Sequence, residues 1–151
     1  SPAPRPDAWG AEGALLCIPA RGPLDGEAAR LAALALRREG FGAAATGPGA
    51  LDASAIGALD AARVRLVCLS VLEEGNSVAG VRTALRRLAR ALPEARVVVG
   101  VWHAAPGSPM LAALREDGAA GALVTTIGEA AAQAAAYAAA GTASATSTQR
   151  A

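Results

Sequence analysis

The chain is poor in the residues that most often bind metals or act as catalysts. It has no lysine, because all fourteen of its basic residues are arginines, and it has one histidine and two cysteines in 151 positions. A zinc centre needs three or four Cys and His ligands at characteristic spacings, and His103, Cys17 and Cys68 show no such spacing. We therefore predict no metal site.

Long apolar runs and an excess of charge are also absent. No stretch of about 18 apolar residues occurs, and no basic segment precedes an apolar one, so neither a membrane span nor a secretory signal is predicted. The 14 basic and 13 acidic residues leave a net charge of +1, which gives no field that would attract nucleic acid. A hydrophobic content of 53% in 151 residues predicts one globular domain with its own core.

The two ends of the chain differ in composition from its middle. Residues 1–13 are rich in proline, and we predict an extended, poorly packed linker there. Residues 141–151 are small, polar and aperiodic, which predicts a disordered tail. The domain is then expected over 14–140. A first residue other than Met, followed by prolines, indicates a piece of a longer protein.

Short apolar runs alternate with helical patterns along the middle of the chain. The runs lie at 14–18, 41–46, 65–70, 96–102 and 121–125. They are continuously apolar, as strands buried on both faces of a parallel sheet are. Right-handed crossovers then favour a flavodoxin-like three-layer sandwich with a five-stranded parallel sheet in the order 2-1-3-4-5.

Helical patterns follow every strand. In 24–39 the apolar positions that recur at three and four are Leu24, Ala28, Leu31, Leu34 and Ala35, which we predict to face the core, with the end of the helix at Gly40. In 77–92 the apolar positions are Val78, Val81, Leu85, Leu88 and Leu92, and Pro93 ends the helix. Shorter helices are expected after Asp52 or Ser54 as far as Ala62, after Ser108, and over 127–140.

This strand order predicts a crevice where the carboxyl ends of strands one and three meet, which is where such sheets bind ligands. Loops 19–27 and 71–77 form its mouth, with further side chains from the end of strand four. The candidate ligand-binding residues are Arg21, Gly22, Asp25, Ser70, Leu72, Glu73, Asn76, Trp102 and His103. We expect Arg21 to face the pair Glu73 and Glu74 across the crevice.

Known catalytic and cofactor patterns do not fit these loops. A phospho-acceptor receiver domain needs an aspartate after strand three and a lysine after strand five, and this chain has Ser70 and no lysine. The segment GPGALD is not a dinucleotide fingerprint, and the acidic Asp25 and Glu27 would repel a phosphate at the first helix. No GxSxG elbow surrounds Ser70, and no acid orients His103 as in a hydrolase. We predict no catalytic residue and no enzyme.

Arg82, Arg86 and Arg90 recur every fourth residue on the helix over 77–92. This row is either a solvated helix face or a docking surface for an acidic partner or for lipid headgroups. Cys17 and Cys68 occupy matching places in strands one and three, where we expect them to be buried as small hydrophobes.

The crevice residues resemble the site of cobalamin-binding domains in part. Those domains have DxHxxG after strand one, SxL after strand three and glycines after strand four, and Ser70-Val71-Leu72 matches SxL. Counting back from Glu39-Gly40-Phe41 places Asp25 where the family has its cobalt-ligating histidine. Gly100 matches one glycine, but Trp102 would crowd the nucleotide channel. The resemblance thus implies the fold but disfavours cobalamin, so no cofactor is expected.

A second resemblance covers residues 14–126. The blocks LCIPARGPLD, LDAARVRLVCLSVLEEGNS and VRTALRRLARALPEARVVVGVW are similar to the soluble C-terminal extension of some bacterial permeases of the autoinducer-2 exporter-like transporter family. The resemblance implies a domain on the cytoplasmic side of the bacterial inner membrane, with the transmembrane part of the same polypeptide as its partner. It implies no activity.

Together these patterns predict a non-enzymatic domain that regulates, senses for or assembles a membrane transporter. A free-standing binder of a small, cobalamin-like molecule is the main alternative, and an enzyme of unknown reaction is the third. A second copy of the chain, in a homo-oligomer, is a further candidate partner.

Overall fold

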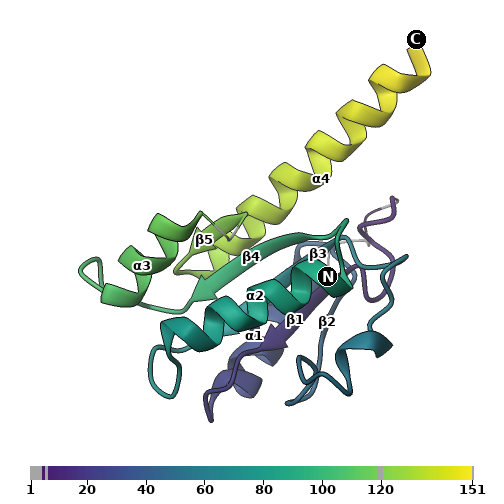
Figure 1. Cartoon of the computed structure of the whole chain (residues 1–151). Coiled ribbons are helices and arrows are strands. Elements are labelled where there is room, and N and C mark those ends of the chain that lie inside the picture. Colours follow the sequence, from purple (N-terminus) through teal and green to yellow (C-terminus); the bar gives the residue numbers. More distant parts are fainter. Residues whose placement is uncertain (1–4, 6, 119–120, 151) are drawn as a thin grey trace.

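The computed structural model describes residue 5, residues 7–118 and residues 121–150, with side chains as far as Gly141. Its sheet has five parallel strands in the order β2-β1-β3-β4-β5, which confirms the predicted topology (Figure 1). The strands are β1 Leu15–Pro19, β2 Ala43–Ala45, β3 Leu66–Val71, β4 Arg96–Val101 and β5 Ala122–Val124. The chain is therefore a flavodoxin-like α/β domain.

Helices cover both faces of the sheet, as the continuously apolar strands require. Helices α1 (Asp25–Arg38) and α4 (Ile127–Arg150) lie on one face, and α2 (Val78–Ala91) and α3 (Pro109–Asp117) lie on the other. Figure 1 shows α2 in front of the strands and α1 behind them. The short 3-10 helix η1 (Ile56–Ala58) lies on the α2 face.

Successive strand residues point to opposite faces, so they divide the interior into two cores. Cys17 of β1 and Cys68 of β3 are register partners and belong to the core under α1 and α4. Their neighbours Ile18 and Leu69 belong to the core under α2 and α3. Both cysteines are buried and form no disulfide, in agreement with the sequence.

Serine caps begin α2 and α3, and the one at Ser108 was predicted from the sequence. The Ser77 hydroxyl accepts a hydrogen bond from the backbone N–H of Gly80 (3.0 Å), and the Ser108 hydroxyl accepts one from Leu111 (3.2 Å). The apolar face predicted for α2 is also buried, because Val81, Leu85, Leu88 and Leu92 all belong to the second core.

Helix α1 presents the opposite face from the one the sequence predicted. Its buried residues are Ala29, Ala32, Ala33, Leu36 and the polar Asp25, whereas Leu24, Leu31 and Leu34 are exposed. Alanines on the buried face allow the helix axis to lie close to the sheet, where leucines would hold it away. The prediction that Leu24, Leu31 and Leu34 face the core was therefore wrong.

The segment between β2 and β3 also differs from the prediction. No α-helix forms over 52–62, and the chain instead makes turns around η1. The Asp60 carboxylate accepts a hydrogen bond from the N–H of Ala62 (3.2 Å), a local bond that competes with helix formation. Gly57 inside η1 further disfavours an α-helix.

The described part of the proline-rich lead-in packs against the domain. The Arg5 guanidinium lies 4.1 Å from the centre of the Phe41 ring, and Trp9 meets the same ring edge-on at 6.4 Å. The carbonyl of Trp9 also accepts a hydrogen bond from Gly42 (2.9 Å). In the described residues, this part of the predicted linker is therefore docked, because Arg5 and Trp9 both contact Phe41.

Helix α4 does not end at Ala140, since its backbone continues through Gly141 to Arg150. A glycine inside a helix costs only about 1 kcal/mol relative to alanine, and no proline follows it. In the described residues, no helix is both long enough and apolar enough to cross a lipid bilayer.

Candidate functional site

The loops after β1 and β3 meet at the carboxyl edge of the sheet, around the side chain of Asp25. This carboxylate is fully buried and accepts three hydrogen bonds. Its Oδ2 accepts from the N–H of Gly22 (2.7 Å) and from Nδ2 of Asn76 (2.8 Å), and its Oδ1 accepts from the N–H of Leu72 (3.0 Å). The predicted crevice residues Gly22, Asp25, Leu72 and Asn76 are therefore brought together.

Asn76 completes this network from the β3 side. Its Nδ2 also donates to the carbonyl of Leu72 (2.7 Å), and its Oδ1 accepts from the N–H of Arg21 (3.1 Å). A Cβ built on Gly22 would lie 2.8 Å from Nδ2 of Asn76, so only glycine fits between the two loops. The polar atoms of Asp25 and Asn76 thus bind the chain itself.

Trp102 fills the space beside this network, at the end of β4. Its indole lies over Gly100, where an added Cβ would overlap the ring, and the side chain is 8% exposed. The indole Nε1 and the hydroxyl of the buried Ser70 have no hydrogen-bond partner among the described residues. Ser70 and Gly100 are register partners, so both lie on the sheet surface under the indole. The indole thus occupies the space above Gly100.

His103 makes a sharp turn directly after Trp102. Its φ of 55° is the one positive value at a described residue other than glycine, and its N–H donates to the carbonyl of Thr125 (2.9 Å). The imidazole is exposed, whereas Ser70 is buried, and no hydrogen bond joins the two side chains in the described structure. These two residues do not form a nucleophile and base pair.

An apolar hollow of about 310 Å³ lies between α1 and the ends of β3 and β4. It is lined by Leu24, Glu27, Ala28, Leu31, Leu72, Trp102, His103 and Ile127. Three candidates from the sequence, Leu72, Trp102 and His103, therefore line one hollow. The contribution of α1 was missed, because its leucines were assigned to the core.

Arg21 lies in a separate hollow, of about 510 Å³, between the loops after β1 and β2. Its guanidinium is 3.9 Å from Oδ1 of Asp52, and both side chains are mostly exposed. Glu73 and Glu74 are also exposed, and no ion pair joins either of them to Arg21 in the described structure. The predicted contact across the crevice was wrong, since the backbone of Arg21 is fixed by Asn76 and its side chain extends toward β2.

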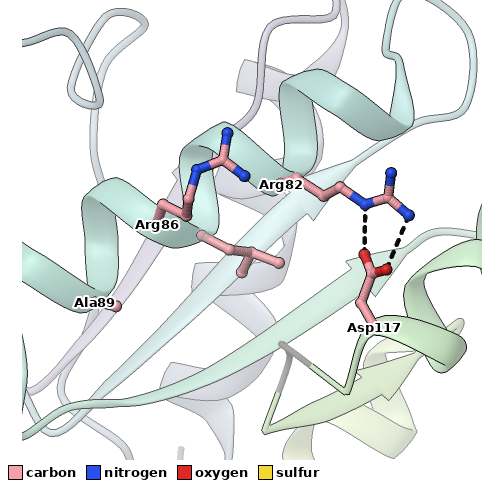
Figure 2. A pocket seen from close by; sticks show the side chains of 5 residues that line it. Arg82, Arg86, Ala89 and Asp117 are labelled. Carbon is pink, nitrogen blue, oxygen red and sulfur yellow. Dashed lines mark hydrogen bonds and ion pairs between the residues drawn. The ribbon is translucent and has the colours of Figure 1, made fainter.

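The arginine row on α2 is partly neutralised (Figure 2). Arg82 binds Asp117 of α3 through two hydrogen bonds, Nε to Oδ2 at 2.6 Å and Nη2 to Oδ1 at 2.8 Å. These bonds raise the pKa of Arg82 and lower the pKa of Asp117 from their ordinary values. Arg86 donates to the hydroxyl of Thr83 (3.1 Å), and Arg90 is exposed. Arg86 and Arg90 thus present charge to solvent, whereas Arg82 fastens α2 to α3.

No metal-binding set is present in the described residues, because no three His, Cys, Asp or Glu side chains gather at one place. The residues at the carboxyl edge also do not suit a histidine-ligated cobalamin. Asp25 stands at the ligand position with its carboxylate already hydrogen-bonded, and the Trp102 indole covers Gly100.

Comparison with known proteins adds no relative: no protein-family model, no curated protein and no solved structure matches the chain.

Proposed function

We propose that this chain is a non-enzymatic interaction domain that regulates or assembles a bacterial membrane transporter. The single observation that supports an interaction role is the carboxyl edge of the sheet. In this fold the edge normally receives a ligand, and here Asp25, Asn76 and Trp102 fill it with the chain's own side chains. A closed edge beside an exposed leucine face suits a domain that binds another protein.

The transporter part of the proposal depends on the resemblance of three sequence blocks to the C-terminal extension of autoinducer-2 exporter-like permeases. It is tested by the coding sequence upstream of Ser1, which is expected to encode several transmembrane helices. A complete reading frame that starts near Ser1 would overturn the transporter role.

Arg86 and Arg90 of α2 allow a test of docking to the membrane part of the parent protein or to anionic lipid. Because Arg82 stabilises the contact between α2 and α3, the informative variant is Arg86→Glu with Arg90→Glu. We expect this variant to keep the wild-type melting temperature and to lose binding to the detergent-solubilised parent protein or to anionic vesicles. The matched control is Arg63→Glu with Arg65→Glu, which makes the same two charge reversals at exposed positions outside α2. Unchanged binding by the α2 variant would reject docking through this face.

The apolar hollow supports a second candidate function, the binding of a small molecule. Trp102 provides an aromatic wall there, next to the exposed imidazole of His103. Titration with cobalamin, followed by the visible spectrum and the melting temperature, tests the cobalamin-like ligand directly. A spectral change or a higher melting temperature supports the candidate, and the absence of both removes cobalamin as its ligand.

A further inference from the structure

The exposed large hydrophobic residues of the described structure gather on one helix. Leu24, Leu31 and Leu34 belong to α1 or its first turn, with exposed fractions of 59%, 61% and 46%. Leucines with about half of their surface in water on a single helix face are unusual for a surface that remains solvated. Contact with a partner would remove this apolar surface from water.

Charged residues continue the same face at both ends of α1. Glu27 lies in the first turn and Arg38 in the last, and both are exposed. The five positions 24, 27, 31, 34 and 38 are separated by three, four, three and four residues, which is the spacing of a coiled-coil seam. We call this set the α1 seam.

Four of the five residues of the α1 seam, Glu27, Leu31, Leu34 and Arg38, are symmetric about one point, and Leu24 lies outside this symmetric part. The point midway between Leu31 and Leu34 is also midway between Glu27 and Arg38. If a second α1 is laid antiparallel across this point, Leu31 of each helix meets Leu34 of the other. At the same time, each Glu27 meets Arg38 of the other helix.

We propose that the α1 seam is the interface of a homodimer, in which two α1 helices pack antiparallel about a two-fold axis. A two-fold interface must be complementary to itself, so that each residue finds its partner on the same surface of the second copy. Glu27, Leu31, Leu34 and Arg38 meet this condition with two leucine pairs at the centre and two ion pairs at the ends. An unrelated partner would not require that order of charges.

Local geometry around the seam is compatible with close helix packing. Ala28 and Ala35, which flank the leucines, are small and half-buried, so they leave room for an approaching helix. Glu27 forms only a loose ion pair with Arg30, at 4.0 Å, and both side chains are mostly exposed. Exchanging this pair for one with Arg38 of a second copy therefore costs little free energy. The apolar hollow lies next to Leu24 and Leu31, at the rim of the same surface.

The interface is short, which predicts a weak dimer. The 14 residues of α1 give a contact line about 21 Å long, at about 1.5 Å per residue. A contact of this size falls at the low end of specific interfaces, so we expect dissociation constants in the micromolar range or weaker.

Sedimentation velocity on the full 151-residue chain at low ionic strength tests the proposal, from low micromolar to near-millimolar concentration. Glu27→Arg alone places an arginine of each copy against Arg38 of the other, and Arg38→Glu alone places a glutamate of each copy against Glu27 of the other. We expect either variant to dimerise at least about tenfold more weakly than the wild type, because two attractive pairs become repulsive. When the two variants are mixed, every facing pair has opposite charges, and a heterodimer should form.

Two controls carry the same charge changes away from the seam, Glu94→Arg and Arg65→Glu, both exposed and outside α1. They should dimerise as the wild type does and gain nothing on mixing. A wild-type chain that stays monomeric overturns the dimer proposal. It does so even if the α1 variants lose binding to the parent transporter, because that result would assign the α1 seam to the transporter and not to a second copy. A dimer that is insensitive to the single variants, or that the mixture does not restore, places the interface elsewhere and also overturns it.

Discussion

The carboxylate of Asp25 accepts a hydrogen bond from Nδ2 of Asn76 at 2.8 Å, across a separation of 51 residues in the chain. This bond joins the first turn of α1 to the loop that precedes α2. The two loops that would border a ligand site are therefore held together by a buried carboxylate whose other bonds go to backbone N–H groups.

Asp25→Asn should destabilise the domain although it keeps the shape of the side chain. An amide has one acceptor oxygen, so at least one of the donors that now bind the carboxylate meets an NH2 group. We expect a loss of about 1–3 kcal/mol in the free energy of unfolding, measured by urea denaturation. Asp60→Asn, at an exposed position, is the matched control and should change stability by less than about 0.5 kcal/mol. Equal effects would show that the Asp25 network contributes little.

Gly100→Ala should destabilise the domain through Trp102, whose ring atoms are the nearest to an added Cβ. An added Cβ overlaps the indole, and overpacking of this kind costs about 1–3 kcal/mol. In a Trp102→Ala background the overlap is gone, so Gly100→Ala should then cost close to nothing. Urea denaturation of the single and double variants measures this coupling. Additive effects would mean that the indole moves aside freely.

The inverted face of α1 predicts opposite effects for neighbouring residues. Ala33→Leu inserts a large side chain against the sheet and should cost about 1–3 kcal/mol, because Ala33 is 2% exposed. Leu34→Gln should change stability by less than about 0.5 kcal/mol when measured at low concentration. If Leu34→Gln were the more damaging change, the leucine face would belong to the core after all.

The thiols of Cys17 and Cys68 should be unreactive in the folded protein. A hydrogen bond with Cys17, together with burial, raises the pKa of Cys68 well above its ordinary value. The protonated Cys68 thiol therefore contributes to the free energy of unfolding. This contribution is fully present below the pKa of an unfolded cysteine, about 8.5, and is lost as the pH rises from there through the raised pKa. Labelling with a thiol reagent at neutral pH should follow global unfolding. Rapid labelling in native buffer would contradict this prediction.

The Arg82–Asp117 pair should contribute stability at neutral pH that disappears in acid. The pKa of Asp117 is lowered by Arg82, so the contribution is present above the ordinary carboxyl range and is lost as the pH falls through the lowered pKa. Because the pair is partly exposed, the effect should be small. The difference in urea midpoint between wild type and Asp117→Asn should narrow toward pH 2. A difference that is independent of pH would rule out the charge as its cause.

The sheet could be predicted from the sequence because each strand is buried on both faces and is therefore apolar throughout. From the five apolar runs and the short connections, the strand order followed directly. The face of α1 could not be predicted in this way, since alanine and leucine are both apolar and their pattern does not tell which side packs against the sheet. The buried side of α1 is decided by how closely the helix can approach the sheet, and this distance depends on the small volume of Ala29, Ala32 and Ala33.

The position of the carboxyl edge was predicted correctly, but the sequence did not show that its polar side chains bind one another. Loops 19–27 and 71–77 meet as expected, because β1 and β3 are neighbours. Whether Asp25 would be free for a ligand depended on Asn76, and a contact across 51 residues has no local signal in the sequence. The side-chain direction of Arg21 was equally undetermined, because Asp52 lies in a segment whose predicted helix did not form.

The docked lead-in changes where this domain should be cut for expression. A truncation at Ala14, as composition alone suggests, would remove Arg5 and Trp9 from the ring of Phe41 and the Trp9 carbonyl from Gly42. Phe41 and Gly42 lead directly into β2, which is an edge strand of only three residues. Exposed edge strands are templates for aggregation. A chain shortened in this way would lose the contacts that hold the start of this edge strand, although every residue of its sheet is intact.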